Sequence, residues 1–245
     1  KPSAQMVYPL SQHIGKQAKP IVKVGDYVLK GQMIAEADGL ISAPIHSSVS
    51  GTVKGIKNHP TISGDKKMSI IVENDFEDNE VEGLGIECDP SNLSNEEIIE
   101  KIKNAGIVGL GGAGFPSYVK LTPKNADEID TVIVNGCECE PYLTCDHRIM
   151  LEKGNEIVKA MRMIAKLFKN AKIVYGIENN KSDSIKVIKG FITPDDNMDI
   201  CELKTKYPQG SERSLIYAIT GRKINSNMLP ADAKCIVINA STAYM

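Results

Sequence analysis

The chain has 245 residues, of which 42% are hydrophobic and 24% are charged, and its formal net charge is −2. These values are typical of a soluble globular protein with one large domain or two smaller ones. A charge this close to zero gives no reason to expect nucleic acid as a partner. No apolar run reaches the roughly 18 residues of a membrane-spanning helix.

The two ends and the cysteines indicate the context of the chain. It begins at Lys1 without Met, shows no signal peptide and stops at Met245 directly after an expected strand, so we expect a fragment of a longer protein. Its six cysteines include no C-x-x-C pair and are too few for a disulfide framework, which favours a reducing, cytosolic environment.

Residues 1–75 are expected to form a small all-β domain. Short runs rich in Val and Ile, separated by Gly turns, predict strands within 20–37, 42–56 and 68–74. The pattern VKVGDYVLKGQ, followed by SGTV, resembles the barrel-sandwich fold of lipoyl and biotinyl carrier domains. Those carriers present a modified lysine on a hairpin, but the corresponding segment ADGL at 37–40 has no lysine. A structural or docking role is therefore expected instead of a carrier function.

An acidic stretch follows this domain. Residues 73–90 contain eight Asp or Glu and no Lys or Arg, which is typical of a solvated linker. We place the linker at 76–92 and a second domain at 93–245.

The second domain is expected to be α/β, with a Rossmann-like and mostly parallel sheet. Ser94 and Glu97 form a capping-box pattern before an amphipathic helix that ends at Gly106. Beyond it, strand-like and helix-like stretches alternate, which predicts a mostly parallel sheet. The strands are expected at 131–135, 172–177, 200–205 and 235–239, and the helices at 146–169, 180–190 and 211–220.

The segment GIVGLGGAGFP at 106–116 contains the dinucleotide-binding pattern G-x-G-x-x-G at Gly109, Gly111 and Gly114. Its context differs from that motif, because a helix instead of a strand precedes it and the first acid after the next strand, Glu138, comes too late. A packing turn is the simplest interpretation. Even so, a loop almost without side chains permits close approach of a flat or phosphorylated ligand, and its N–H groups favour anions.

The stretch NGCECEPYLTCDHR at 135–148 follows the first strand of the expected parallel sheet, at the end where α/β folds bind ligands. In it Glu138 and Glu140 alternate with Cys137 and Cys139, and Asp146 is placed to cap the following helix.

Four segments together resemble the C subunit of Rnf complexes, which are membrane-bound, ion-translocating ferredoxin:NAD+ oxidoreductases. They are GLGGAGFPSYVKL, NGCECEPYLTCDHR, KYPQGSERSLIYAITGR and LPADAKCIVINAST. The resemblance covers residues 6–245, including YPLSQHIG near the N-terminus. A weaker similarity runs to the flavoprotein of respiratory complex I, whose glycine loop and acidic segment bind FMN and NADH.

The resemblance implies an FMN site with the nicotinamide of NADH stacked on the flavin. The glycines would approach the flavin and its ribityl phosphate, Phe115 would stack on NADH, and Lys120 would stabilise the anionic reduced flavin. The other implied contacts reach the ribityl chain, the ring edge, the NADH ribose and the FMN phosphate. The implied site residues are Gly109, Gly111, Gly112, Gly114, Phe115, Lys120, Asn135, Glu138, Glu140, Tyr207, Gly210, Glu212, Asn239 and Thr242. Cys137 and Leu110 depart from the complex I pattern, which has Asp and Arg there.

The resemblance also implies a reaction and partners. Hydride would pass between nicotinamide C4 and flavin N5 without a catalytic acid or base, and single electrons would pass to iron–sulfur clusters. The 4Fe-4S ligand motif of the family is missing here, so such clusters are expected only in the full-length protein. Partners would be the other Rnf subunits and, indirectly, ferredoxin. The expected location is peripheral, on the cytoplasmic face of the membrane.

Three alternatives stay open at this point. Cys137, Cys139 and Cys145 could bind a metal, although C-x-C-x5-C lacks a fourth ligand. The chain could be a docking scaffold without flavin, or a soluble electron carrier related to cobalamin or proline reductases. The order of the domains and the CEPYLTCDHR segment favour Rnf. None of the four histidines is assigned a catalytic role.

Overall fold

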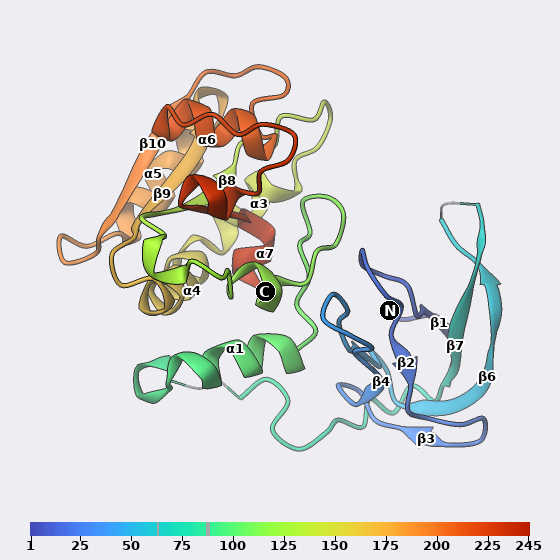
Figure 1. Cartoon of the computed structure of the whole chain (residues 1–245). Coiled ribbons are helices and arrows are strands. Elements are labelled where there is room, and N and C mark those ends of the chain that lie inside the picture. Colours follow the sequence, from blue (N-terminus) through green and yellow to red (C-terminus); the bar gives the residue numbers. More distant parts are fainter. Residues whose placement is uncertain (63, 87–88) are drawn as a thin grey trace. The chain divides into compact units, whose positions relative to one another are not determined.

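The computed structural model describes residues 1–62, 64–86 and 89–245, which form two compact units (Figure 1). The first unit comprises Lys1–Val108 with Gly112–Val119, and the second comprises Gly109–Gly111 with Lys120–Met245. None of the helices in these described ranges combines the length and the apolar character needed to cross a bilayer.

The first unit is built from two small antiparallel sheets. One sheet has the strand order β1-β7-β6-β3 and the other has the order β2-β4-β5. The strands are β1 (Gln5–Pro9), β2 (Lys19–Pro20), β3 (Tyr27–Val28), β4 (Met33–Glu36), β5 (Ile45–His46), β6 (Gly51–Pro60) and β7 (Lys66–Asn74). The expected all-β character is confirmed, but β1 was not among the expected strands. It pairs with β7 along its whole length, from Gln5 opposite Glu73 to Pro9 opposite Ser69.

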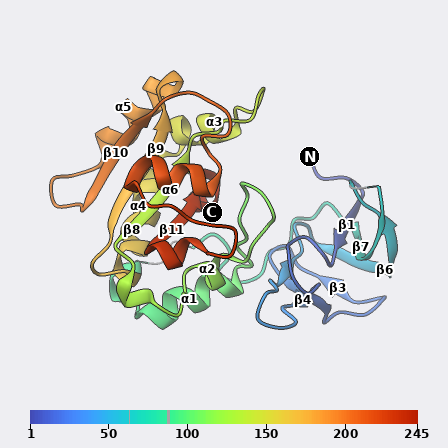
Figure 2. The same cartoon turned by 45° about the horizontal axis from the view of Figure 1, so that its top comes forward.

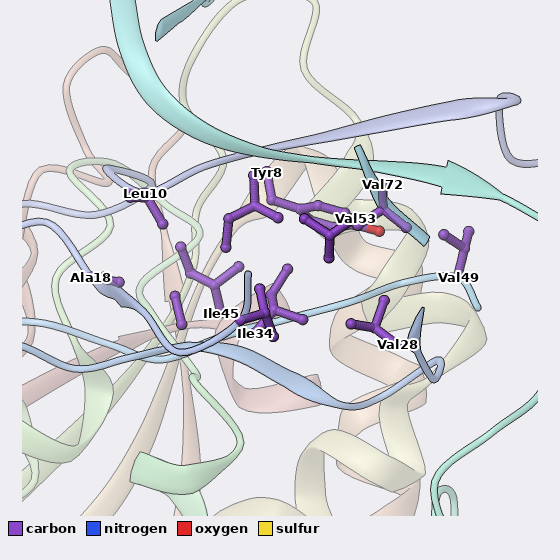
Figure 3. Packing of buried hydrophobic residues seen from close by; sticks show 12 residues of the cluster. Tyr8, Leu10, Ala18, Val28, Ile34, Ile45, Val49, Val53 and Val72 are labelled. Carbon is purple, nitrogen blue, oxygen red and sulfur yellow. The ribbon is translucent and has the colours of Figure 1, made fainter. Parts of the chain in front are cut away.

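An apolar cluster forms the core between the two sheets of the first unit (Figure 3). Its members come from β1, β3, β4, β5, β6, β7 and the connecting loops, and most are inaccessible to solvent. They include Tyr8, Leu10, Ala18, Val28, Ile34, Ile45, Val49, Val53 and Val72. Burial of this apolar surface is the main force that stabilises so small a sandwich.

The start of the acidic stretch is attached to this sandwich. The Lys30 backbone N–H donates to the Asn79 carbonyl at 2.9 Å, and its ammonium contacts the Glu80 carboxylate at 2.6 Å. Tyr27 donates to Asp75 at 2.7 Å. Residues 87 and 88, which also belong to the expected linker, lie outside the described residues.

Helix α1 (Asn95–Asn104) belongs to the first unit and confirms the expected capping box. The Glu97 backbone N–H donates to the Ser94 hydroxyl at 3.2 Å, and the Ser94 N–H donates to the Glu97 carboxylate at 2.8 Å. Gly106 follows the helix with φ +70°, and a Cβ there would lie 2.5 Å from the Pro44 carbonyl oxygen. Glycine is therefore required at Gly106 both by backbone conformation and by space.

The second unit is the expected α/β domain with a parallel sheet (Figure 2). Its strand order is β10-β9-β8-β11, and every neighbouring pair is parallel. The strands are β8 (Thr131–Gly136), β9 (Lys172–Glu178), β10 (Met198–Leu203) and β11 (Cys235–Asn239). Helix α2 (Ser117–Lys120) joins the two units along the chain. The helices of the second unit are α3 (Cys145–Glu152), α4 (Gly154–Leu167), α5 (Ser182–Phe191), α6 (Glu212–Thr220) and α7 (Ala240–Tyr244). Short 3₁₀ turns lie at Pro90–Asn92, Ala126–Glu128, Asn179–Lys181 and Pro230–Ala233.

Alternation along the strands directs side chains to two helical layers. Ile133 of β8 and Val237 of β11 pack with Leu215 and Ile216 of α6. The helices α3, α4, α5 and α7 pack against one another. Gly136, whose position in β8 faces the opposite side of the sheet from Ile133, lies against Met150 of α3.

Three expected boundaries were wrong. The helix expected at 146–169 is divided into α3 and α4, because Lys153 between them has a non-helical φ of −127°. The helix expected at 180–190 begins with a 3₁₀ turn and becomes α-helical only at Ser182. The strand expected at 200–205 ends at Leu203, and the Thr205 hydroxyl and N–H both donate to the Asn179 side-chain oxygen instead.

Candidate functional site

The carboxyl edge of the parallel sheet brings several predicted site residues of the second unit together. Asn135 at the end of β8 lies in register with Asn239 at the end of β11. The Asn135 amide donates to the Gly210 carbonyl at 2.8 Å, and the Gly210 N–H donates to the Cys139 thiol sulfur at 3.2 Å. A Cβ on Gly210 would lie 3.3 Å from side-chain atoms of Cys137 and Cys139. The YPQG loop is thus packed closely against the end of β8.

Lys120 and Glu212, two further predicted residues, also meet at this edge. The Lys120 ammonium donates to the Glu212 carboxylate at 3.0 Å and to the Val237 carbonyl at 2.9 Å. Their side chains are 31% and 41% exposed, respectively. Two fixed acceptors hold the ammonium in one place, while solvent or a ligand still reaches it.

Asn239 and Thr242 are positioned by a network around the start of α7. The Asn239 side-chain oxygen accepts from the Thr242 N–H at 3.2 Å, and the Thr242 hydroxyl accepts from the Leu110 N–H at 2.9 Å. A Cβ on Gly111 would lie 3.0 Å from the Asn239 Cβ. The first part of the glycine loop, Gly109–Gly111, is therefore fastened to the end of β11.

Asp146 does not cap α3 as expected. The N-cap residue is Thr144, and Asp146 lies in the first turn with a buried carboxylate. That carboxylate accepts from the Asn239 amide at 2.6 Å and from the Ser241 hydroxyl. Asp146 thus links α3 to the end of β11 and the start of α7.

Glu138 occupies the capping place that was expected for Asp146. Its carboxylate accepts from the backbone N–H groups of Asp146 at 2.7 Å and His147 at 3.1 Å. The Cys145 thiol donates to it at 3.4 Å. Since these are the unpaired N–H groups of the first turn of α3, Glu138 acts as a charged cap. Its predicted flavin contact remains a prediction.

The remaining predicted loop residues Gly112, Gly114 and Phe115 belong to the first unit. Gly114 has φ +66°, and a Cβ there would lie 3.1 Å from the Gln12 carbonyl oxygen. A Cβ on Gly112 would meet no atom within 4 Å. Phe115 is half-buried.

A cavity of about 320 Å³ lies at the same edge of the sheet, toward β9. It is lined by residues 138–144, by His147, and by Glu178, Asn180, Lys181 and Thr205. Of the predicted site residues, Glu138 and Glu140 line it, whereas Lys120 and Asn239 do not. Within the described residues the Glu140 carboxylate accepts no hydrogen bond from another part of the chain, and it is exposed.

The residues that sequence reasoning missed are Glu178 and Lys181, which are only 1% and 5% exposed. The signal that could have found Glu178 is its position as the last residue of a buried apolar strand, at the ligand-binding end of the sheet. Lys181 follows three residues later in a polar stretch, which is typical of an exposed helix start.

The central cysteines do not gather into one site. Burial raises the pKa of the Cys137 thiol to about 12, so it stays protonated, and the Cys139 sulfur accepts from Gly210. Within the described part of the chain, the metal-type ligands that lie within 4.8 Å of one another are Glu138, Cys145 and Asp146. Both carboxylates of that group already accept hydrogen bonds from the protein.

The donor set at this edge fits a flavin mononucleotide. The exposed backbone of Gly111 offers an N–H group without a side chain, and a partly exposed ammonium lies at Lys120. Polar side chains at Asn135 and Asn239 stand at neighbouring strand ends. Backbone N–H groups and a cation suit a phosphate and an electron-rich ring.

Comparison with known proteins gives consistent matches for both units. Residues 102–245 match the family model of the Nuo51 FMN-binding domain, and residues 1–77 match that of the RnfC barrel sandwich hybrid domain. These matches and the parallel sheet confirm the expected fold class.

Curated relatives are similar over nearly the whole chain. The C subunit of the Na(+)-translocating ferredoxin:NAD(+) oxidoreductase complex of Acetobacterium woodii is 41% identical over 99% of this chain and 55% of its own length. The proton-translocating counterpart of Clostridium ljungdahlii is 42% identical over 96% and 51%. The chain thus spans about half the length of these relatives. Among solved structures, an NAD+-reducing [NiFe]-hydrogenase shares the fold with a TM-score of 0.53 and 21% identity, over 64% of this chain and 30% of that chain.

Proposed function

Because the chain belongs to the family of Rnf complex C subunits, and its residues 102–245 to the Nuo51 FMN-binding domain family, we propose that its second unit binds FMN at the carboxyl edge of the sheet. One observation carries the proposal. Lys120, Asn135, Gly210 and Glu212 come from three separate segments, and hydrogen bonds join them in two pairs at that edge. Such convergence at the ends of parallel strands is where α/β folds bind ligands.

The residues at this edge have distinct tasks in the proposed site. The exposed backbone at Gly111 lets a ligand approach the chain closely. Lys120 holds a positive charge, oriented by Glu212 and the Val237 carbonyl, where it favours negative charge on a ligand. Asn135 keeps the Gly210 loop in place through its amide. FMN, when bound, supplies the chemistry that connects a two-electron hydride donor to one-electron carriers.

The wider function is inferred from the names of the relatives. As C subunits of ferredoxin:NAD(+) oxidoreductase complexes, they act with other subunits in ion translocation. We propose that this chain likewise passes electrons between NAD(H) and iron–sulfur clusters of the complete protein, and from there to ferredoxin. It would do so as a peripheral part of a membrane complex on the cytoplasmic face.

The experiment is a titration of the purified chain with FMN, followed by flavin fluorescence quenching. NADH is then added without oxygen, and the absorbance of oxidised flavin is followed. We expect stoichiometric binding and bleaching by NADH. Lys120→Met should weaken FMN binding about tenfold, because it removes a charged donor. The control Lys124→Met removes an exposed lysine four residues away and should leave binding unchanged.

Two results would contradict the proposal in different ways. A wild-type chain that quenches no flavin fluorescence would contradict FMN binding and favour the docking-scaffold alternative. A chain that binds FMN but shows no bleaching by NADH would keep the flavin site and reject NAD(H) as its redox partner.

A further inference from the structure

A buried ion pair lies next to the proposed flavin site without belonging to its predicted residues. Lys181 is 5% exposed and Glu178 is 1% exposed, and the Lys181 Nζ lies 3.6 Å from the Glu178 Oε2. Lysine and glutamate are almost never buried this completely unless they are paired, because removing a charge from water is costly. A hydrophobic pair at these two positions would avoid the free-energy cost of removing charges from water. The contacts that the two charged groups make should therefore explain why they are buried here.

Those contacts join the segments that follow three neighbouring strands. The Lys181 ammonium donates to the Cys137 carbonyl, just beyond β8, at 2.6 Å. The Glu178 carboxylate at the end of β9 accepts from the Lys206 N–H, beyond β10, at 3.3 Å. The Asn179 side chain adds a second bond across the same gap, from the Thr205 hydroxyl at 2.7 Å.

The Cys137 carbonyl has a particular need for this donor. The last residue pair of the β8–β9 ladder is Gly136 with Ile177, so the Cys137 carbonyl lies past the regular ladder. Cys137 itself is fully buried. A buried carbonyl without a partner is destabilising, and the buried ammonium supplies the partner.

The joined segments carry the proposed flavin contacts. Cys137 directly precedes Glu138, Cys139 and Glu140. Lys206 directly precedes Tyr207 and the loop to Gly210, whose far end is bound to Asn135. The 205–210 loop is therefore held at its start by the segment after β9 and at its end by β8.

We propose that Lys181 is a positioning residue: by donating to the Cys137 carbonyl while paired with Glu178, it sets the 137–140 turn against the 205–210 loop in the arrangement that receives the flavin. The inference rests on the proposed FMN site. Lys181 needs no contact with the flavin itself, since its ammonium is already satisfied by protein groups.

The test is the double variant Lys181→Met/Glu178→Gln in the 245-residue chain. It removes both buried charges together, so no unpaired charge is left, and Gln still offers an oxygen to the Lys206 N–H. Methionine cannot donate to the Cys137 carbonyl. The matched control is Lys186→Met, which removes an exposed lysine of α5.

Two readouts separate positioning from general destabilisation. We expect the FMN dissociation constant to rise about tenfold. We also expect backbone amides at 137–140 to exchange hydrogen about tenfold faster without flavin, while amides in the centre of β8 and β9 keep their wild-type protection. Lys186→Met should change neither.

Several outcomes would overturn the inference. One is unchanged exchange at 137–140 in the double variant, and another is faster exchange with unchanged FMN affinity. Exchange that accelerates equally throughout the sheet would assign the pair a purely structural role. If the double variant does not fold, NMR of the wild-type chain decides: a slowly exchanging Lys181 ammonium signal supports the contact, and its absence rejects it. Failure of the wild-type chain to bind FMN would instead reject the proposed function, and the exchange result would still decide whether Lys181 holds the turn.

Discussion

Glu138 offers a direct test of how the site is assembled, because its side chain and its backbone make separable contributions. The carboxylate caps α3 through the N–H groups of Asp146 and His147. The backbone of Glu138 is left-handed, with φ +46°, a conformation that costs any residue other than glycine energy. Three substitutions, Glu138→Gln, Glu138→Ala and Glu138→Gly, alter these contributions in different combinations.

The expected magnitudes follow from the contacts. Glu138→Ala loses two hydrogen bonds to a charged acceptor in the first turn of α3, and we expect the free energy of unfolding to fall by about 3 kcal/mol. Glu138→Gly loses the same bonds but relieves the left-handed strain, so about 1 kcal/mol should be regained. Glu138→Gln keeps an oxygen acceptor and loses the charge, at a cost of about 1 kcal/mol.

The assay is urea unfolding followed by far-ultraviolet circular dichroism, with the slope compared among variants to check that the same transition is measured. The expected order of stability is wild type, then Gln, then Gly, then Ala. A Gly variant less stable than the Ala variant would refute the assignment of strain at Glu138. A Gln variant as stable as wild type would refute the charged cap.

Other predictions address charge, reactivity and the second carboxylate. Hydrogen bonds from Arg162 hold the pKa of the Asp196 carboxyl well below its usual value. The ion pair therefore stabilises the folded chain fully above the unfolded-state pKa of about 3.9, and this stabilisation is lost as the pH falls below that value. Asp196→Asn should lower the free energy of unfolding by about 2 kcal/mol at neutral pH, and the difference between variant and wild type should shrink in acid. With its pKa raised to about 12 by burial, Cys137 should resist alkylation in the folded chain, whereas exposed Cys145 should be labelled, as mass spectrometry would show. Glu140→Gln should leave stability within about 0.5 kcal/mol of wild type yet weaken flavin or NADH binding; unchanged binding would remove Glu140 from the site.

The fold was predictable because its signals are local and repeated. Alternating strands and helices indicated a parallel sheet, and the capping box at Ser94 and Glu97 marked the start of α1 correctly. β1 was missed since its identity depends on pairing with β7, whose residues lie at least 60 positions further along the chain. The break at Lys153 was missed although Gly154, a residue type that often marks a helix end, directly follows it.

The site was predictable only in part. Motif resemblance pointed to Lys120 and Glu212 separately, and the structure adds that they contact each other across 92 residues of sequence. Lys181 left no signal, because a lysine near a helix start is nearly always solvated. Its burial depends on where the Cys137 carbonyl lies, which only the three-dimensional arrangement reveals.

The CECE segment shows how a local pattern can mislead about function. Alternation predicts two thiols on one face of a strand and two carboxylates on the other, but β8 ends at Gly136 and the left-handed residue Glu138 turns the chain. Each position then serves a different neighbour: the Cys137 carbonyl meets Lys181, the Glu138 carboxylate caps α3, and the Cys139 sulfur accepts from Gly210. Only the Glu140 carboxylate is left exposed, without a hydrogen-bond partner within the described residues. The two carboxylates of the segment are therefore not equivalent. Glu138 stabilises the fold as a helix cap, so Glu140 is the one that we expect to contact a ligand.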